Sequence, residues 1–389
     1  MKKDECMNEK SGSCSDDAAS VAIADIRPMV SVVVPAYNEA SILRDNIGKL
    51  CRYLQELEDR YAWELIIVND GSSDNTGEVA EKCAAEWKNV YVLHHPYNFR
   101  LGQALRFAFS NCRGDYVVVM DVDLSYSVDH IERMIKRINE TKAKIVIASP
   151  YMQGGAVRNV PPFRKFLSKW ANWYLCLMVA KDGFSDPLTT ITGMVRTYDR
   201  EFLSRLNLKA MDVTINSEII YKAMILRARI VEIPAILDWG CQKKERCAKA
   251  PSRKSSMKMV RAIMHSIVSG FMFRPFLFFI YPGLLFIMLS FYPLGWTVAH
   301  SVDYFQELSS TRLSLFDRLS DAIGMSFNLS PHAFIVGGFA LVIGIQLSNL
   351  GLMALQNKRY FEELFFLASN IFGQNLKRNS DSKKKIANL

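Results

Sequence analysis

The sequence predicts an α/β fold, a doubly wound sheet with helices on both of its faces, followed by two apolar helices. Three observations support this prediction. Short β-branched runs alternate with helical segments through the first part of the chain. The run at 116–120 is continuously apolar, as expected for a parallel strand that is covered on both faces. Two much longer apolar runs then occupy residues 276–299 and 333–355.

The alternation of strands and helices places several polar segments at one edge of the predicted sheet. We expect strands at 30–34, 63–68, 90–94, 116–120, 145–148 and 230–234, and helices at 42–60, 77–87, 103–111 and 128–140. Polar segments follow the first four strands, at 37–39, 69–76, 96–102 and 121–125. Right-handed crossovers bring the carboxyl ends of parallel strands to the same edge, so these segments predict a ligand site there.

Two carboxylates follow directly after the fourth predicted strand. Asp121 and Asp123 are two residues apart, so in an extended chain both side chains point the same way. Two converging carboxylates repel each other unless a cation lies between them. Oxygen ligands suit Mg²⁺ or Mn²⁺, and Mg²⁺ is usually held by one or two carboxylates plus substrate phosphates. We therefore expect a divalent metal at Asp121 and Asp123; a loop with two solvated aspartates is the alternative.

The composition indicates a protein that meets a membrane and anionic groups. Of the 389 residues, 50% are hydrophobic, the mean hydropathy is +0.04 and the formal net charge is +9. In a chain with long apolar segments, such a charge favours contact with anionic lipid or phosphate. The sequence shows no RNA-binding or helix-turn-helix pattern, so we expect no nucleic-acid partner.

The eight cysteines form no C-x-x-C pair. Most of them lie in helical or buried stretches, which favours free thiols in a reducing cytosol. A metal or redox pair of Cys241 and Cys247 is the alternative.

The two long apolar runs are each long enough to cross a hydrocarbon core of about 30 Å as a helix. Lysine and arginine are abundant on the outer flanks of both runs, whereas acidic residues outnumber basic ones in the connection at 301–330. The positive-inside rule then places both termini and the catalytic domain in the cytoplasm, with a short loop outside. We expect an integral membrane protein; the buried two-helix core of a soluble protein is the alternative.

These patterns divide the chain into five parts. We expect a disordered tail at 1–28, a catalytic domain at 29–240, a basic juxtamembrane segment at 241–274, the two-helix anchor at 275–356, and an interfacial helix with a basic tail at 357–389. Residues 164–178 carry aromatic side chains at helical spacing beside basic ones. This segment is either an ordinary amphipathic helix or a helix that lies on a membrane surface.

Three motifs together resemble those of the family 2 glycosyltransferases of GT-A fold. They are Val34-Pro35-Ala36-Tyr37-Asn38-Glu39, Asn69-Asp70-Gly71-Ser72-Ser73-Asp74 and Asp121-Val122-Asp123-Leu124. Within that family the chain is most similar to polyprenyl-phosphate glycosyltransferases of the dolichol-phosphate mannosyltransferase and bactoprenol glucosyltransferase kind. The resemblance covers about residues 30–260 and implies a mixed GT-A sheet. The two apolar helices resemble the membrane anchor of many members.

The resemblance implies a role for each matching position. Nucleotide binding is implied for Pro35, Tyr37, Glu39, Asp70, Gly102 and Asp121, and metal binding for Asp121 and Asp123. Acceptor-phosphate binding is implied for Arg158, Arg164, Ser168, Arg253 and Lys254, and a catalytic role for Asp121, Asp123, Arg164 and Arg196. Three positions depart from the family pattern: Ser125 replaces a frequent glutamine, Met194-Val195 replaces part of a G-F-R motif, and Trp239 stands about where an arginine is usual.

The implied reaction moves a sugar from a nucleoside diphosphate sugar, a UDP- or GDP-sugar, to undecaprenyl or dolichyl phosphate in the membrane, with inversion at the anomeric centre. One alternative is a glycosyltransferase that acts on another lipid or on a polysaccharide, although the Q-x-x-R-W string of processive synthases is absent from the sequence. A second alternative is a membrane scaffold without enzymatic turnover. A homo-oligomer is a further alternative, because the sequence does not fix the oligomeric state.

Overall fold

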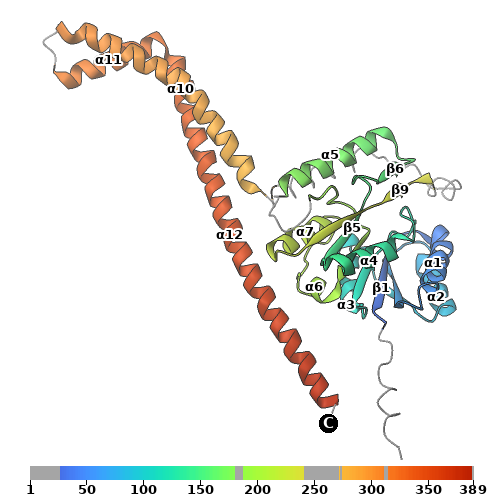
Figure 1. Ribbon diagram of the computed structural model, residues 1–389. Coiled ribbons are helices and arrows are strands. Elements are labelled where there is room, and N and C mark those ends of the chain that lie inside the picture. The colour runs from blue at the N-terminus through green and yellow to red at the C-terminus, as the bar shows by residue number, and fades with distance from the viewer. Residues whose placement is uncertain (1–26, 180–186, 241–270, 272–273, 311–313, 388–389) are drawn as a thin grey trace, which may run out of the picture.

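The computed structural model describes residues 27–179, 187–240, 271, 274–310 and 314–387. Figure 1 shows an α/β domain from which a long helical hairpin projects. The domain contains β1 (Met29–Ala36), α1 (Ala40–Gln55), β2 (Ala62–Asp70), α2 (Thr76–Glu86), β3 (Val90–His95), α3 (Leu101–Asn111), β4 (Tyr116–Val119), α4 (His130–Thr141), β5 (Ile145–Ser149), β6 (Ala156–Arg158), α5 (Pro162–Met178), β7 (Arg196–Asp199), α6 (Arg200–Ser204), α7 (Ile215–Ile225), β8 (Ile230–Pro234) and β9 (Ile236–Asp238). The hairpin contains α10 (Pro275–Glu307), the 3₁₀ helix η1 (Leu308–Ser310), α11 (Leu315–Leu329) and α12 (Pro331–Ala387).

The central sheet has seven strands in the order β3-β2-β1-β4-β7-β5-β8. Neighbouring strands pair in parallel except at β7, which runs antiparallel between β4 and β5. β6 and β9 form a separate parallel pair. The predicted α/β class, a mixed sheet with helices on both faces, is confirmed. The sequence-based prediction lacks β6, β7 and β9 because each has only three or four residues, too few for a clear periodicity.

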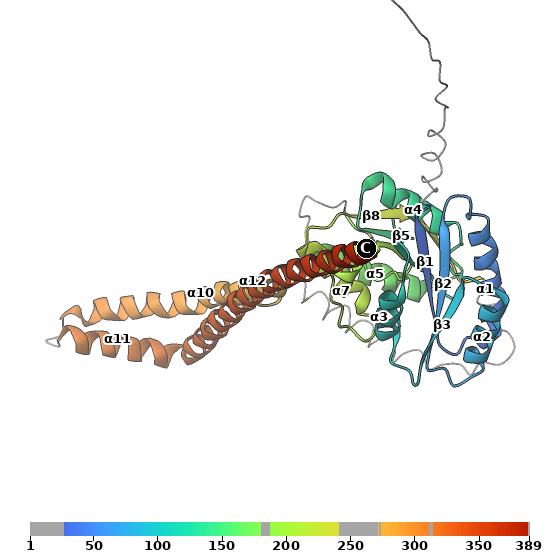
Figure 2. The same ribbon diagram turned by 90° about the horizontal axis from the view of Figure 1, so that it is seen from below.

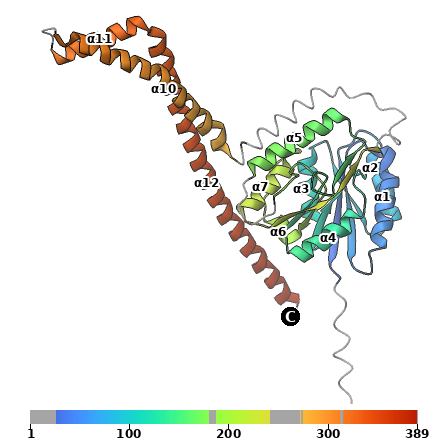
Figure 3. The ribbon, with the colours of Figure 1, turned by 45° about the horizontal axis from the view of Figure 1, so that its top comes forward.

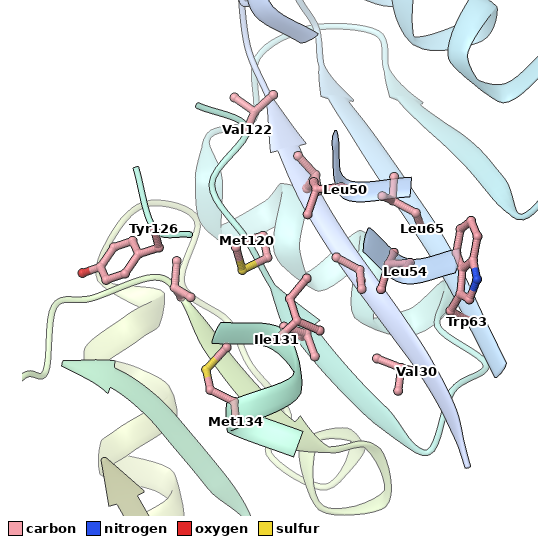
Figure 4. Packing of buried hydrophobic residues seen from close by; sticks show 14 of the residues in the cluster. Val30, Leu50, Leu54, Trp63, Leu65, Met120, Val122, Tyr126, Ile131 and Met134 are labelled. Carbon is pink, nitrogen blue, oxygen red and sulfur yellow. The ribbon is translucent and has the colours of Figure 1, made fainter. Parts of the chain in front are cut away.

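The central strands bury both faces because apolar residues occupy most of their successive positions. In β1, Val32 and Val34 belong to one core cluster and Val33 to the other. Figure 4 shows the first cluster, in which Leu50 of α1 and Met134 of α4 pack over the strands. The second cluster is covered by α3, α6 and α7. Each fully buried valine or leucine stabilises the fold by roughly 1.5–3 kcal/mol relative to its exposed state, so the sheet is a rigid support for the loops at its edge.

The small residues of α10 and α12 allow the two helices to pack closely. A Cβ added to Gly344 would lie 2.6 Å from Ile287 Cγ1, and one added to Gly351 would lie 2.4 Å from Ile280 Cγ1. Such close contact through glycine is typical of helices that associate in membranes. Both helices are long and apolar enough to cross a membrane, and only 11% and 17% of their most apolar stretches are buried. This low burial argues against the buried core of a soluble protein.

The connection between the two apolar helices differs from the short loop that we predicted. It contains α11, which packs on α10 through Ala322 and Ser326, with Ser326 Oγ donating to Thr297 O at 3.0 Å. The two buried positions are four residues apart, so they lie on one face of the helix. An apolar cavity of about 400 Å³, lined by Phe305 and Phe334 among others, lies between these helices and far from the sheet edge.

The interfacial helix predicted at 357–389 is not a separate element, because α12 continues through this segment without a break. Past the hairpin, α12 contacts the α/β domain (Figures 1 and 2). Phe361 stacks on Tyr221 of α7 with ring centroids 6.2 Å apart, and Phe365 is buried beneath Lys222, whose Nζ lies 5.3 Å from the ring centroid. The apolar side of an amphipathic segment can contact either a membrane surface or another part of the protein. Here it contacts α7.

Candidate functional site

The turns after β1 and β2 are fastened to each other. The N–H groups of Asn38 and Glu39 donate to Ser72 Oγ and Thr76 Oγ1, at 3.0 and 2.9 Å. In the opposite direction, Ser73 N–H donates to Asn38 Oδ1 at 2.8 Å. These bonds hold both polar turns at the carboxyl edge of the sheet, where open α/β sheets bind their ligands.

Three residues of the predicted nucleotide pocket lie at this first turn. Pro35 and Glu39 are half-buried, and the ring of Tyr37 is 41% exposed. An exposed aromatic ring beside a fixed polar turn offers a flat apolar surface for a base or a ribose. Nucleotide binding by these three residues stays a prediction.

Asp70 ends β2 and is buried. Its Oδ1 lies 2.7 Å from His95 Nδ1 and accepts the N–H of Phe99 at 3.0 Å, which ties β2 to the turn after β3. Gly71 follows with a φ of +61°, and a Cβ there would lie 2.1 Å from the backbone of Tyr97. Only glycine therefore fits at this crossing. Asp70 shapes the loop that we predict to hold the base, and its contact with the base stays a prediction.

Gly102 has a close backbone neighbour that the sequence did not indicate. Its N–H donates to Met211 O at 2.9 Å, and an added Cβ would lie 2.4 Å from Ala210 O. The carboxylate of Glu218 in turn accepts the Ala210 N–H at 2.8 Å. Gly102 thus lets the segment before α7 pack against the start of α3, beside the turn after β3.

Asp121 and Asp123 lie in a tight turn after β4, and not in the extended chain that we predicted. Leu124 closes the turn by donating its N–H to Asp121 O at 3.1 Å, with a φ of +48°. Ser125 contacts both carboxylates. Its N–H donates to Asp123 Oδ1 at 2.9 Å, and its hydroxyl donates to Asp121 Oδ2 at 3.4 Å. The two carboxylates therefore meet at Ser125.

The electrostatics of this turn suit a divalent cation. Burial, and then the charge of Asp123, raises the pKa of Asp121 to about 7. A cation beside two such carboxylates would relieve their repulsion. Among the residues that the structure describes, no three or more His, Cys, Asp or Glu side chains are grouped to hold a metal ion. A metal here would be bound by Asp121, Asp123 and the oxygens of a bound substrate, which is the usual coordination of Mg²⁺ in proteins.

Tyr126 connects the carboxylate turn with helix α5. Burial raises the pKa of its phenol, and the nearby Asp121 and Tyr151 raise it further. The Tyr151 hydroxyl donates to Ser168 Oγ on α5 at 2.8 Å. The sequence analysis did not single out Tyr126 or Tyr151, because a tyrosine outside a motif carries no local signal of its neighbours.

The residues predicted to bind the acceptor phosphate gather near one end of α5. Arg164 lies one turn before Ser168, and its guanidinium stacks over Trp239, 4.4 Å from the ring centroid. The Trp239 N–H donates to Arg158 O at 3.3 Å. The structure thus brings Arg158, Arg164 and Ser168 into one neighbourhood. Arg253 and Lys254, like Cys241 and Cys247, lie outside the described residues.

The outward side of α5 is apolar. Its exposed members are Phe163, Phe166, Trp173 and Leu177, which are 55–66% exposed. Lys165 and Lys169 are exposed beside them. An ordinary amphipathic helix turns its apolar side inward, so this arrangement favours the helix that lies on a membrane surface.

Arg196 lies in the interior and not in the open site that the resemblance implies. It is fully buried, and its guanidinium donates to three backbone carbonyls, those of Gly193 at 2.8 Å, Asn216 at 2.9 Å, and Ile191. With its donors directed at the protein, Arg196 supports the loop at 189–193. Its role toward a ligand stays a prediction.

Two residues that the sequence analysis missed hold the same loop from other sides. The carboxylate of Glu232 on β8 accepts the N–H groups of Thr189 and Thr190 at 2.7–3.0 Å. Asn172 on α5 accepts the N–H of Ile191 through Oδ1 at 2.9 Å. A single acid within the apolar strand β8 is the signal that would have identified Glu232, since a buried carboxylate needs partners.

Comparison with known proteins identifies the family. The family model described as glycosyl transferase family 2 matches residues 31–206. The polyprenol monophosphomannose synthase of Mycolicibacterium smegmatis is 31% identical over 220 residues, which cover 54% of this chain and 78% of that protein. The chain belongs to glycosyl transferase family 2. This confirms the resemblance that the three motifs indicate.

This family 2 glycosyltransferase chain is also similar to proteins of which it matches a smaller part. Dolichyl-phosphate beta-glucosyltransferase ALG5A of Trichomonas vaginalis is 37% identical over 146 residues, 36% of this chain and 45% of that protein. The dolichol-phosphate mannosyltransferase of Pyrococcus furiosus is 30% identical over 205 residues, 53% of this chain and 55% of that protein. The chain thus matches only about half of the length of these two relatives.

The chain also resembles solved structures at low sequence identity. The mannosyltransferase PcManGT of Pyrobaculum calidifontis, solved with GDP-Man and Mn²⁺, has a TM-score of 0.41 and 16% identity, covering 90% of this chain and 88% of that one. Glucosyl-3-phosphoglycerate synthase of Mycobacterium tuberculosis has a TM-score of 0.45 and 17% identity, covering 62% of this chain and 80% of that one.

Proposed function

We propose that this chain transfers a sugar from a nucleoside diphosphate sugar to a polyprenyl phosphate in the membrane, with inversion at the anomeric carbon. Relatives that share its family 2 domain carry the names of polyprenyl- and dolichyl-phosphate glycosyltransferases. The observation that carries the proposal is the meeting of Asp121 and Asp123 at Ser125, within a family 2 domain that is joined to two long apolar helices.

The donor diphosphate is assigned to the turn after β4. A diphosphate gains negative charge as the glycosidic bond breaks, and Mg²⁺ or Mn²⁺ held by Asp121 and Asp123 would supply charge stabilisation there. Ser125 orients both carboxylates through its N–H and hydroxyl. The nucleoside would lie at the neighbouring turns, against the exposed ring of Tyr37.

The acceptor phosphate is assigned to the end of α5 that carries Arg164 and Ser168. A phosphate monoester is mostly dianionic near pH 7, because its second pKa is about 6. Such an oxygen attacks C1 of the sugar without a general base, while the bond from C1 to the diphosphate breaks on the opposite side. Arg164 and Ser168 would hold and orient the phosphate in charge-assisted hydrogen bonds.

The position of α5 suits an acceptor that stays in the membrane. Leu277 and Phe278 at the start of α10 pack against the same core cluster as Leu175 of α5, so the hairpin leaves the domain close to this helix (Figure 3). The exposed apolar side of α5 would rest on the cytoplasmic surface of the bilayer, with both termini in the cytoplasm. A prenyl chain could then remain in lipid while its phosphate reaches Arg164.

The test uses the full-length protein in detergent with Mn²⁺, undecaprenyl or dolichyl phosphate, and UDP- or GDP-sugars that carry a radiolabel. We expect label to enter the organic phase with at least one donor. Asp123→Asn should slow this transfer by about a hundredfold or more, the scale seen when one group that stabilises developing charge is removed.

The matched control is Asp45→Asn, which removes an exposed carboxylate from α1 and should leave the rate unchanged. Transfer by Asp123→Asn at the wild-type rate would contradict the metal role. Label that appears only as free sugar would contradict the lipid acceptor.

A further inference from the structure

Beyond the hairpin, α12 has two apolar sides. One side carries Phe361 and Phe365, which contact α7. The other side carries four exposed residues that we call the α12 seam: Tyr360, Leu364, Leu367 and Ile371, which are 65%, 67%, 58% and 60% exposed. At about 100° per residue, the seam lies roughly 110° around the helix from the side that contacts α7. The α/β domain therefore leaves the seam uncovered.

The α12 seam lies outside the hydrocarbon core if the hairpin spans a membrane, as proposed above. Gly351 lies against Ile280 near the start of α10, so Arg274 and Lys358 stand at about the same level and mark the polar boundary. From Lys358 to Ile371 the helix rises by about 20 Å, alongside the α/β domain. Lipid tails do not extend this far from the hydrocarbon core, so we expect another protein surface to contact the seam.

The spacing of the seam residues indicates that the contacting surface is another helix. The seam residues follow one another at steps of four, three and four residues, the repeat of a coiled coil. In heptad letters Leu364 and Ile371 occupy position a, and Tyr360 and Leu367 occupy position d. The exposed Asn357 stands at the preceding a position. Ile371 at a, Leu367 at d and the single Asn357 at a match the pattern of parallel two-stranded coils, whereas Leu364 at a and Tyr360 at d depart from it.

We propose that the α12 seams of two copies of this chain pair as a short parallel coiled coil next to the membrane. Two copies anchored in one membrane share their orientation, so a two-fold axis along the bilayer normal makes their α12 helices parallel. The same register continues toward the membrane through Met353 and Leu350, which are also exposed. The two copies of Asn357 would pair across the axis and set the register.

The first experiment is disulfide cross-linking of the full-length protein in proteoliposomes. Serine replaces the cysteines that are partly exposed or outside the described residues, namely Cys6, Cys14, Cys176, Cys241 and Cys247. The buried cysteines stay, because burial raises the pKa of the Cys51 and Cys112 thiols to about 12 and keeps them unreactive. Leu364→Cys then tests the seam, and Phe366→Cys is its matched control on another exposed side of α12.

We expect mild oxidation to convert Leu364→Cys into a covalent dimer and to give at least about tenfold less dimer from Phe366→Cys, because a disulfide needs Cα atoms within about 7 Å. Equal yields from the two variants would overturn the inference. A second result would also overturn it. If the Leu364→Cys thiol forms no dimer, and a water-soluble maleimide labels it in detergent but not in vesicles, then the membrane surface covers the seam.

A second measurement needs no new cysteine. Light scattering of the purified protein should give the mass of two chains for wild type and for Phe366→Lys, and of one chain for Leu364→Lys combined with Leu367→Lys. Wild-type protein with the mass of one chain would overturn the inference. Because the seam is exposed in each chain, the double variant should remain folded and unfold in one cooperative thermal transition. Sugar transfer is measured in parallel, so a missing dimer with intact transfer counts against the pairing alone.

Discussion

Glu232 lies beside Thr189, and its carboxylate accepts both the N–H and the hydroxyl of that residue, at 2.9 and 2.6 Å. β8 thereby holds the loop at 189–193, which Asn172 also ties to α5. Glu232 and Asn172 both accept backbone N–H groups of this loop, so its shape depends on buried acceptors and not on apolar packing alone. This loop is consequently a sensitive point of the domain.

Glu232→Gln should destabilise the protein by about 2–3 kcal/mol, because it removes charged hydrogen bonds and turns an amide NH₂ toward buried N–H groups. The thermal unfolding midpoint of the full-length protein measures this loss. Glu140→Gln removes an exposed carboxylate and should change the stability by less than about 0.5 kcal/mol. Equal midpoints for the two variants would show that Glu232 does not support the loop.

Arg196→Lys should reduce the free energy of unfolding by about 2–4 kcal/mol, because lysine cannot reach the carbonyls of Ile191, Gly193 and Asn216 together. The thermal unfolding midpoint should fall accordingly. The KM values for donor and acceptor should change little in the protein that remains folded. A variant with the wild-type midpoint that has lost transfer would instead support the catalytic role that the family resemblance implies.

Gly102→Ala should destabilise the protein by about 1–3 kcal/mol, because the new methyl group would overlap the carbonyl of Ala210. It should also raise the KM for the nucleotide sugar, since the start of α3 must shift beside the predicted nucleotide loops. The matched control is Gly48→Ala in the middle of α1, where an added Cβ meets no atom within 4 Å. That change should stabilise the helix by about 0.5–1 kcal/mol.

Trp239→Ala should raise the KM for the prenyl phosphate two- to fivefold, as expected from the loss of about 0.5–1 kcal/mol in an exposed cation–π contact with Arg164. The KM for the nucleotide sugar serves as the internal control and should not move. An effect on the donor alone would mean that Arg164 does not hold the acceptor phosphate.

Several features of the site were within reach of the sequence. Uninterrupted apolar runs such as Val32 to Val34 indicated parallel strands, and the polar turns after them were expected at one edge. The carboxylates of Asp121 and Asp123 were expected to converge, and they do meet, at Ser125. The geometry was wrong, because a turn closed by Leu124 replaces the extended chain.

Other features depended on partners far away in the chain. Arg196 matches a family motif, but a carbonyl group of Asn216 on α7, together with those of the adjacent loop at 189–193, determines that its guanidinium faces inward. Glu232 stands out in the sequence as a single acid in an apolar strand, but its partner Thr189 is 43 residues away and was not predictable. The segment that follows Lys358 was predicted to lie in the membrane interface, and its contact with Tyr221 shows that it lies along the domain.

The sequence by itself determined the longer strands and helices of the α/β domain, the position of the two carboxylates after β4 and the two apolar helices, because these follow from local periodicity and residue chemistry. Only the tertiary structure decided the antiparallel insertion of β7, the burial of Arg196 and the course of α12. Each of these depends on contacts between residues that are distant in the chain, and such contacts leave no periodic trace in either partner alone.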